Sequence, residues 1–124
     1  MQGFKMLVGA AVLATASTFA AAVAGPVGEI ADKDSILNDP DAVKRGELHF
    51  YQNCVYCHGS RGSGGKSKPL QNRDFTDDYL FKTITQGKKR GSLVMPPWGK
   101  SMSEKIRWEL VTYIQSLSDK ESSD

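Results

Sequence analysis

The stretch Cys54-Val55-Tyr56-Cys57-His58 decides how the rest of this 124-residue chain is interpreted. Its pattern, C-x-x-C followed at once by His, is typical of the covalent attachment of a c-type haem. Two thiols three residues apart can each form a thioether with a vinyl group on one edge of a porphyrin, and the adjacent imidazole then lies beneath the iron. We therefore expect Cys54 and Cys57 to attach one haem c and His58 to ligate its iron.

Two other kinds of site use the same residue types. A C-x-x-C redox disulfide is expected near a βαβ pattern, which the sequence lacks. A structural zinc site needs four ligands, whereas the chain has only two Cys and two His. His49 could join a metal cluster, but a single His on a helix is more often a surface or packing residue. Haem attachment is therefore the favoured interpretation.

The first 24 residues have the layout of a secretory signal peptide. Lys5 precedes a run without charge from Met6 to Ala24, and Ala22-Val23-Ala24 fits an A-x-A cleavage site. An uncleaved membrane anchor is the alternative, because the uncharged run approaches the length that crosses a bilayer. Covalent haem attachment occurs outside the bacterial inner membrane, so both features predict a periplasmic protein, in contact with the membrane only if the signal is retained as an anchor.

The remaining 100 residues are expected to hold a single small domain. Residues 25–39 are interpreted as a polar extension, residues 40–118 as the domain and residues 119–124 as a polar tail. A chain of this size buries roughly two thirds of its unfolded surface, so a haem would supply much of the missing core.

Three segments combine an N-terminal capping residue with apolar residues at helical spacing. The predicted helices run from Pro40, capped by Asp39, to Cys54; from Asp77, capped by Thr76, to Gln86, with Gly87 as terminator; and from the capping box Ser101-Met102-Ser103-Glu104 to Leu117. No alternating run of useful length predicts a strand. The fold class is therefore all-α, with three main helices and long loops wrapped around one haem.

These features resemble the class I c-type cytochromes, which are small monohaem electron carriers, from Pro40 to Leu117. In that family a Gly and an aromatic residue stand eight and four positions before the first haem Cys, and they pack against a Leu-x-x-Tyr pair on the last helix. Gly46 and Phe50 match the first pair, and Leu110 and Tyr113 match the second. The resemblance implies the cytochrome c fold for this domain.

The resemblance also implies a methionine ligand on the second haem face. Met95 lies in Val94-Met95-Pro96-Pro97-Trp98, which is similar to the family's methionine loop between the second and third helices. Met102, at the start of the last helix, and His49 are the less favoured candidates. Ligation by His58 and Met95 would fill the coordination sphere, which disfavours catalysis and implies a raised reduction potential.

Two further residues are assigned to the haem site by resemblance. Pro69 is placed to offer its carbonyl oxygen to the second ring N–H of His58. Trp98 follows the methionine loop and is expected to line or hydrogen-bond the haem propionates. The Gly-rich segment 59–68 is interpreted as a flexible rim beside the haem, because Ser60 stands where a phosphate-binding Walker pattern would need Gly. The predicted haem-binding set is Cys54, Cys57, His58, Met95, Pro69 and Trp98.

Basic residues concentrate in the middle of the chain. Residues 44–107 contain 13 basic and 5 acidic residues, a net charge of +8, whereas the whole chain has a net charge of +2. Lys88-Lys89-Arg90 would form either a basic rim beside the methionine loop or a merely solvated turn. A rim would steer an acidic redox partner into a small, transient complex. The aromatic and basic interleaving used on nucleic acids is absent from the sequence, so no nucleic acid partner is expected.

The sequence as a whole predicts a periplasmic carrier of single electrons that is not an enzyme and has no small-molecule substrate. Its expected partners are redox proteins, with a dehydrogenase as donor and a cytochrome or terminal oxidase as acceptor. One alternative is an electron-accepting haem subunit of a larger dehydrogenase or oxidase complex. The other is a small haem peroxidase or gas-binding protein, which would require that Met95 be absent from the iron or readily displaced.

Overall fold

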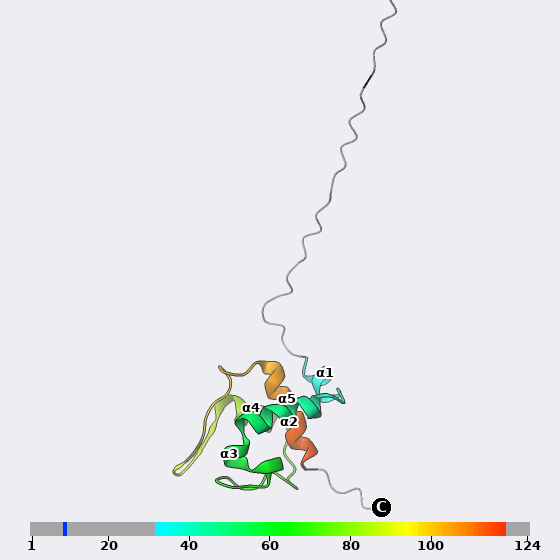
Figure 1. Ribbon diagram of the computed structural model, residues 1–124. Coiled ribbons are helices and arrows are strands. Elements are labelled where there is room, and N and C mark those ends of the chain that lie inside the picture. Colours follow the sequence, from blue (N-terminus) through cyan, green and yellow to red (C-terminus); the bar gives the residue numbers. More distant parts are fainter. Residues whose placement is uncertain (1–8, 10–31, 119–124) are drawn as a thin grey trace, which may run out of the picture.

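Two helices that are far apart in the sequence form the centre of the domain: α2 (Ala42–Asn53) and α5 (Glu104–Ser116). They cross in the middle of the domain (Figure 1). The computed structural model describes Gly9 and residues 32–118. The expected tail lies outside the described residues, and so do the expected signal peptide, apart from Gly9, and residues 25–31 of the expected extension. None of the helices in the described part of the chain is long and apolar enough to cross a bilayer.

Shorter elements surround this pair of helices. In chain order they are α1 (Lys33–Leu37) before α2, then α3 (Val55–His58), the 3-10 turn η1 (Ser60–Gly62), α4 (Asp77–Gln86), β1 (Lys88–Arg90) and β2 (Leu93–Met95). The two strands form an antiparallel hairpin in which Lys88 pairs with Met95. In the view of Figure 1, α1 lies on one side of the central pair and the hairpin on the other.

The domain is mostly helical, which confirms the predicted fold class. The hairpin was not predicted, because its strands have three residues each and no side chain in them is fully buried. Strand prediction relies on alternation between a buried and an exposed face, and such short, exposed strands carry no alternation.

The predicted start of α2 is wrong by two residues. The helix begins at Ala42, after Asp41, and not at Pro40. The Asp39 carboxylate instead accepts a hydrogen bond from the Asp41 N–H at 2.9 Å, and the Asp39 carbonyl accepts one from the Ala42 N–H at 3.0 Å. Asp39 therefore closes a turn that leads into the helix, a role open to Asp because its short side chain reaches the N–H two residues onward.

The capping residue predicted for α4 is correct, and the one predicted for α5 is wrong. Thr76 Oγ1 accepts a hydrogen bond from the Tyr79 N–H at 3.2 Å, which confirms the predicted cap and bounds of α4. For α5 the capping residue is Ser103, whose Oγ accepts from the Ile106 N–H at 3.3 Å, and not Ser101. Both serines suit a cap, and the choice of Ser103 puts an acidic residue at the first helical position, where it complements the helix dipole.

The short helix α1 was also missed by sequence analysis. Ile36 is 7% exposed and belongs to the core, and α1 packs against α5. Lys33 Nζ lies 2.9 Å from Asp78 Oδ1 on α4 and 5.1 Å from the ring centroid of Trp108 on α5. Burial of one such isoleucine contributes about 1.5–3 kcal/mol, so a segment with a single anchoring side chain can still be fixed to the domain.

The crossing of α2 and α5 depends on Gly46. A Cβ atom at this position would overlap the backbone carbonyl of Glu109 and lie 2.8 Å from Cβ of Tyr113. Phe50, one turn further along α2, packs on Tyr113 with ring centroids 5.2 Å apart, and Leu110 is buried beside them. The four residues expected to pack between the two helices therefore all lie in the core: Gly46, Phe50, Leu110 and Tyr113.

A buried carboxylate also joins the two helices. Glu109 on α5 is 2% exposed, and its Oε1 accepts a hydrogen bond from Arg45 Nε at 2.5 Å. Arg45 Nη2 also donates to Asp39 Oδ2, and this hydrogen bond holds the pKa of Asp39 below its ordinary value. His49 Nε2 lies 3.5 Å from Glu109 Oε2. His49 thus faces the helix interface, which accounts for it as a packing residue.

We expect Gly46→Ala to lower the free energy of unfolding by about 1–3 kcal/mol, because the new methyl group would force the two helices apart. Leu48→Ala is the matched control, since Leu48 lies on the same helix and is exposed. Chemical denaturation of the three proteins measures the difference. Equal stability of both variants would contradict the close-contact role of Gly46.

Candidate functional site

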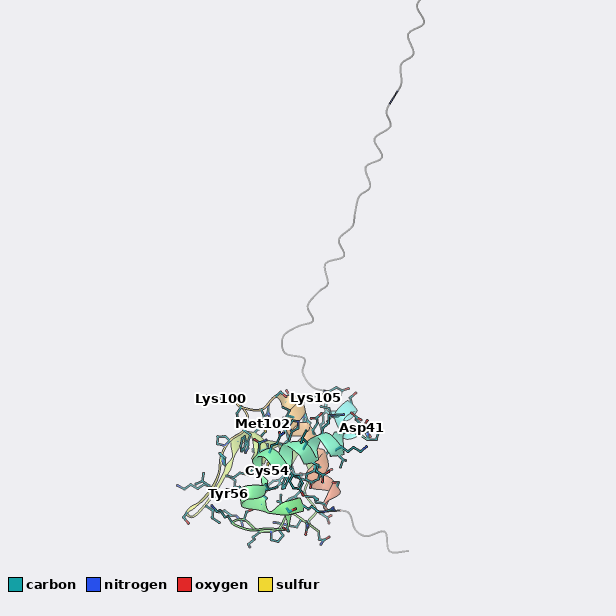
Figure 2. All side chains as sticks on the ribbon, in the orientation of Figure 1. Asp41, Cys54, Tyr56, Lys100, Met102 and Lys105 are labelled. Carbon is teal, nitrogen blue, oxygen red and sulfur yellow. The ribbon has the colours of Figure 1, made fainter. Side chains whose placement is uncertain are left out.

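Cys54, Cys57 and His58 come together because α3 starts immediately after α2. Cys54 is the junction between the two helices, and its carbonyl accepts hydrogen bonds from the N–H groups of Cys57 at 3.2 Å and His58 at 3.0 Å. Both cysteines carry free thiols, and all three side chains are partly buried. In Figure 2, Cys54 lies toward the centre of the molecule and Tyr56, between the two cysteines, lies at its edge.

Burial shifts the pKa values of Cys54 and His58. Burial, with a smaller contribution from charge on Cys57, raises the pKa of the Cys54 thiol to about 11. Burial also lowers the pKa of His58, which favours the neutral imidazole near pH 7. A neutral imidazole is the form that ligates a metal.

The ring of His58 is hydrogen-bonded on one side. Its Nδ1 lies 2.8 Å from Ser67 Oγ, in the loop that follows α3. The carbonyl of Pro69, expected to hold this ring, accepts a hydrogen bond from Arg73 Nη1 at 3.4 Å. Sequence reasoning missed Ser67. The available signal was a hydroxyl group two residues before the expected acceptor.

Met95 is the last residue of β2 and is held against α4 by backbone contacts. Gly87 ends α4 with φ of 73°, and a Cβ atom there would lie 2.5 Å from the Met95 carbonyl oxygen and 2.8 Å from the Pro97 nitrogen. On the far side of the segment, the Trp98 N–H donates to the Ile84 carbonyl of α4 at 2.9 Å. The methionine segment is therefore fixed to α4 at both ends.

The other candidates for this region occupy different environments. Met102 is buried in the core, and its N–H donates to the Trp98 carbonyl at 2.9 Å, so it acts in packing. The side chains of Met95 and Trp98 are partly buried and pack against the edge of the core. Partial burial leaves both of them surface with which to contact a bound group.

The residues present fit a haem. Two free thiols stand at the required spacing, a neutral imidazole follows them, and a thioether is available on a separate segment. Apolar side chains that are only partly buried adjoin the core from several elements, as an apolar ring would require: Cys54, Val55, Leu70, Phe75, Phe81, Met95 and Trp98. Between residues 32 and 118, no three His, Cys, Asp or Glu side chains gather as the ligands of a metal ion.

The mostly helical fold and its cysteine pair with an adjacent histidine define a c-type cytochrome domain. Residues 41–114 match the protein family described as "Cytochrome C oxidase, cbb3-type, subunit III", and the chain belongs to this family. The match confirms the resemblance seen in the sequence and implies haem c as the cofactor.

Two curated relatives are subunits of oxidases. The chain is 33% identical over 92 residues to the "Cbb3-type cytochrome c oxidase subunit CcoP" of Rubrivivax gelatinosus, a match that covers 68% of this chain and 29% of the relative. It is 34% identical over 86 residues to the "Cbb3-type cytochrome c oxidase subunit FixP" of Bradyrhizobium diazoefficiens, covering 62% of this chain and 28% of the relative. The chain thus spans less than a third of the length of either protein.

Solved structures support the same fold. Cytochrome cL from the marine methylotrophic bacterium Methylophaga aminisulfidivorans superposes with a TM-score of 0.56 at 26% identity, over 64% of this chain and 55% of that protein. Cytochrome cL from Hyphomicrobium denitrificans gives a TM-score of 0.51 at 25% identity, over 64% of this chain and 48% of that protein. The cytochrome c fold is therefore shown by sequence family and structure alike.

We expect Gly87→Ala to disturb the methionine segment, because the added methyl group meets the backbone at Met95 and Pro97. Gly91→Ala is a matched control. Gly91 also has a positive φ, of 58°, but none of the described atoms lies within 4 Å of its Cβ position. Both substitutions incur backbone strain of about 1–3 kcal/mol, and only Gly87→Ala adds a clash.

Amide NMR spectra and chemical denaturation distinguish the two variants. The greater loss of stability, with shifted resonances from residues 93–98, should belong to Gly87→Ala. If Gly91→Ala were equally disruptive, the contact between α4 and the methionine segment would not be what fixes that segment.

Proposed function

We propose that this domain carries one haem c and transfers single electrons between redox proteins. Cys54 and Cys57 would attach the haem, and His58 and Met95 would be its two axial ligands. The observation that carries the proposal is the presence, in one helical turn, of two free thiols and an imidazole at the spacing typical of haem attachment. Because Nδ1 of that imidazole is already hydrogen-bonded to Ser67, Nε2 remains for the iron.

The bound haem would supply a reversible one-electron couple. The protein's own residues determine how that couple is used. The thioether of Met95 is a soft donor that favours ferrous iron, so it would raise the reduction potential. Ligation by both His58 and Met95 would leave no coordination position for oxygen or peroxide, which favours an electron carrier over an enzyme.

Absorption spectra test the axial ligands directly. The parent protein, made in a host with haem-maturation machinery, should be low-spin, show the weak far-red sulfur-to-iron band when oxidised, and ignore carbon monoxide. Met95→Ala should lose that band, become high-spin and bind carbon monoxide, because its iron lacks a sixth ligand. Met102→Leu is the control, since Met102 is a core residue and leucine conserves its volume.

A Met95→Ala protein that keeps the low-spin spectrum and the far-red band would contradict Met95 as a ligand. A parent protein that already binds carbon monoxide would instead favour a peroxidase or gas-binding role. Failure of a Cys54→Ser, Cys57→Ser double variant to lose its covalently bound haem in a denaturing gel would contradict the attachment residues.

We also propose that the domain works in the bacterial periplasm. Two stretches of sequence support this independently: the signal-like residues 1–24 and the haem-attachment motif, whose chemistry takes place outside the inner membrane. Cell fractionation and the mass of the isolated protein test the proposal. A mature chain that begins at Gly25 would indicate cleavage, and a full-length chain in the membrane fraction would indicate a retained anchor.

A second candidate function is an electron-transfer subunit of a terminal oxidase complex. It is favoured by the similarity to CcoP and FixP, both named as subunits of cbb3-type cytochrome c oxidases. Affinity purification from gently solubilised membranes separates the two functions. Stoichiometric recovery with other oxidase subunits indicates a fixed component, and recovery alone with rapid electron exchange indicates a mobile carrier.

The β1–β2 hairpin is the best candidate for the partner-docking surface. Its basic residues Lys88, Lys89 and Arg90 are all exposed, and across the hairpin Leu93 and Val94 are 53% and 62% exposed. Lys88 Nζ donates to Tyr79 Oη at 2.6 Å, whereas no hydrogen bond or ion pair among the described residues involves the side chain of Lys89 or Arg90. Exposed apolar residues ringed by positive charge suit a transient complex with an acidic partner.

We expect Lys89→Glu to slow electron transfer with an acidic redox protein by roughly two- to tenfold at low ionic strength, and salt to reduce the difference. Lys44→Glu is the matched control, because it makes the same charge change on α2, where Lys44 pairs with Asp41. Stopped-flow rates over a range of salt concentrations measure both effects. Rates that are flat or rise with salt in the parent protein would rule out steering by this surface.

A further inference from the structure

We propose that Ser67 is a positioning residue for the iron ligand His58. Its Oγ is hydrogen-bonded to His58 Nδ1, and its hydroxyl donates to the carbonyl of Cys57. The inference deepens the proposed function and rests on ligation of the haem by His58. It assigns to a side chain the role that the family resemblance had given to the carbonyl of Pro69.

The distances place Ser67 between the two haem-binding residues. Ser67 Oγ lies 2.8 Å from His58 Nδ1 and 3.1 Å from the carbonyl oxygen of Cys57. The backbone N–H of Ser67 also donates to that carbonyl at 3.1 Å. The same residue is thus attached to the haem-binding turn through both its backbone and its side chain.

The proton count links the directions of the two hydrogen bonds of the Ser67 hydroxyl. A hydroxyl has one proton, and the carbonyl of Cys57 can only accept. If Ser67 gives its proton to that carbonyl, it must accept from Nδ1, and His58 then carries its proton on Nδ1 and leaves Nε2 with a lone pair. This is the tautomer that can ligate iron through Nε2. In the reverse arrangement the proton would sit on Nε2 and block ligation.

The loop that carries Ser67 is braced against the same turn. The Gly64 N–H donates to the His58 carbonyl at 2.7 Å, and the Gly65 N–H donates to the Ser67 carbonyl at 3.0 Å. A Cβ atom at Gly65 would lie 3.3 Å from the Cys57 carbonyl oxygen, so the loop backbone passes close to the turn. Segment 59–68 therefore holds a side chain in place, which goes beyond the expected flexible rim.

An acceptor on Nδ1–H has two consequences for the ligand. It fixes the rotation of the imidazole ring, and it increases the electron density that Nε2 offers to the metal. A stronger imidazole donor stabilises ferric iron relative to ferrous iron. Loss of the Ser67 hydroxyl should therefore raise the reduction potential of the bound haem.

An isosteric pair of variants tests the role. Ser67→Thr keeps the hydroxyl and Ser67→Val replaces it with a methyl group of similar shape, so any disturbance from the larger side chain is common to both. We expect the reduction potential to rise in Ser67→Val and to stay near the parent value in Ser67→Thr. The Nδ1–H proton of His58 should exchange faster with solvent in the valine variant, as measured by NMR of the reduced protein.

Ser60→Ala is the control for a general loop effect. Ser60 lies in the same loop, but its Oγ is hydrogen-bonded to Tyr51 Oη at 2.9 Å, whereas His58 Nδ1 is bonded to Ser67. The inference is overturned if Ser67→Val and Ser67→Thr share the parent potential and exchange rate while the haem stays His/Met-ligated. Absence of a low-spin, covalently bound haem in the parent would be a failure of the proposed function instead.

Discussion

The contact between α2 and α5 at Gly46 is the constraint on which the rest of the fold depends. Because this position has no side chain, the backbone of α2 lies directly on the backbone of α5. One turn later Phe50 packs on Tyr113, and its ring centroid is 6.2 Å from that of His58. The next turn of the chain is Cys54 and the start of α3. A close helix crossing in the core thus fixes where the cofactor-binding turn must lie.

The methionine segment is attached to the domain by a different route. It follows α4, which packs on α5, and Gly87 and Ile84 hold it to α4 through backbone contacts. The turn with His58 and the segment with Met95 therefore reach the common helix α5 through separate neighbours, α2 and α4. A cofactor bound by both would join two parts of the structure that the chain supports independently, so its binding should add to the cooperativity of folding.

Sequence analysis succeeded where the structure of a segment is determined by residues within that segment. Thr76 caps α4 through a bond to an N–H three residues away, and Gly87 ends it with a positive φ, so both bounds could be predicted from local chemistry. The expectation that Gly46 and Tyr113 meet came from the family resemblance. The contact of Ser67 with His58 could not be predicted in this way. It depends on how the loop between these two residues, which are nine positions apart, folds back. Helix α1 was missed for a similar reason, since its stability depends on tertiary burial of Ile36.

Acidic and basic residues are concentrated on opposite sides of the domain. Residues 32–41 contain four Asp and one Lys, a net charge of −3, whereas β1 consists of three basic residues. In the views of Figures 1 and 2, Asp41 and α1 lie on the opposite side of the α2–α5 pair from the hairpin. An approaching acidic partner would be attracted to the hairpin and repelled from the α1 end. Because Met95 is the last residue of the second strand of that hairpin, the same orientation would bring the proposed iron ligand to the partner. In the proposed function, the short, exposed strands would therefore connect partner recognition with the haem site.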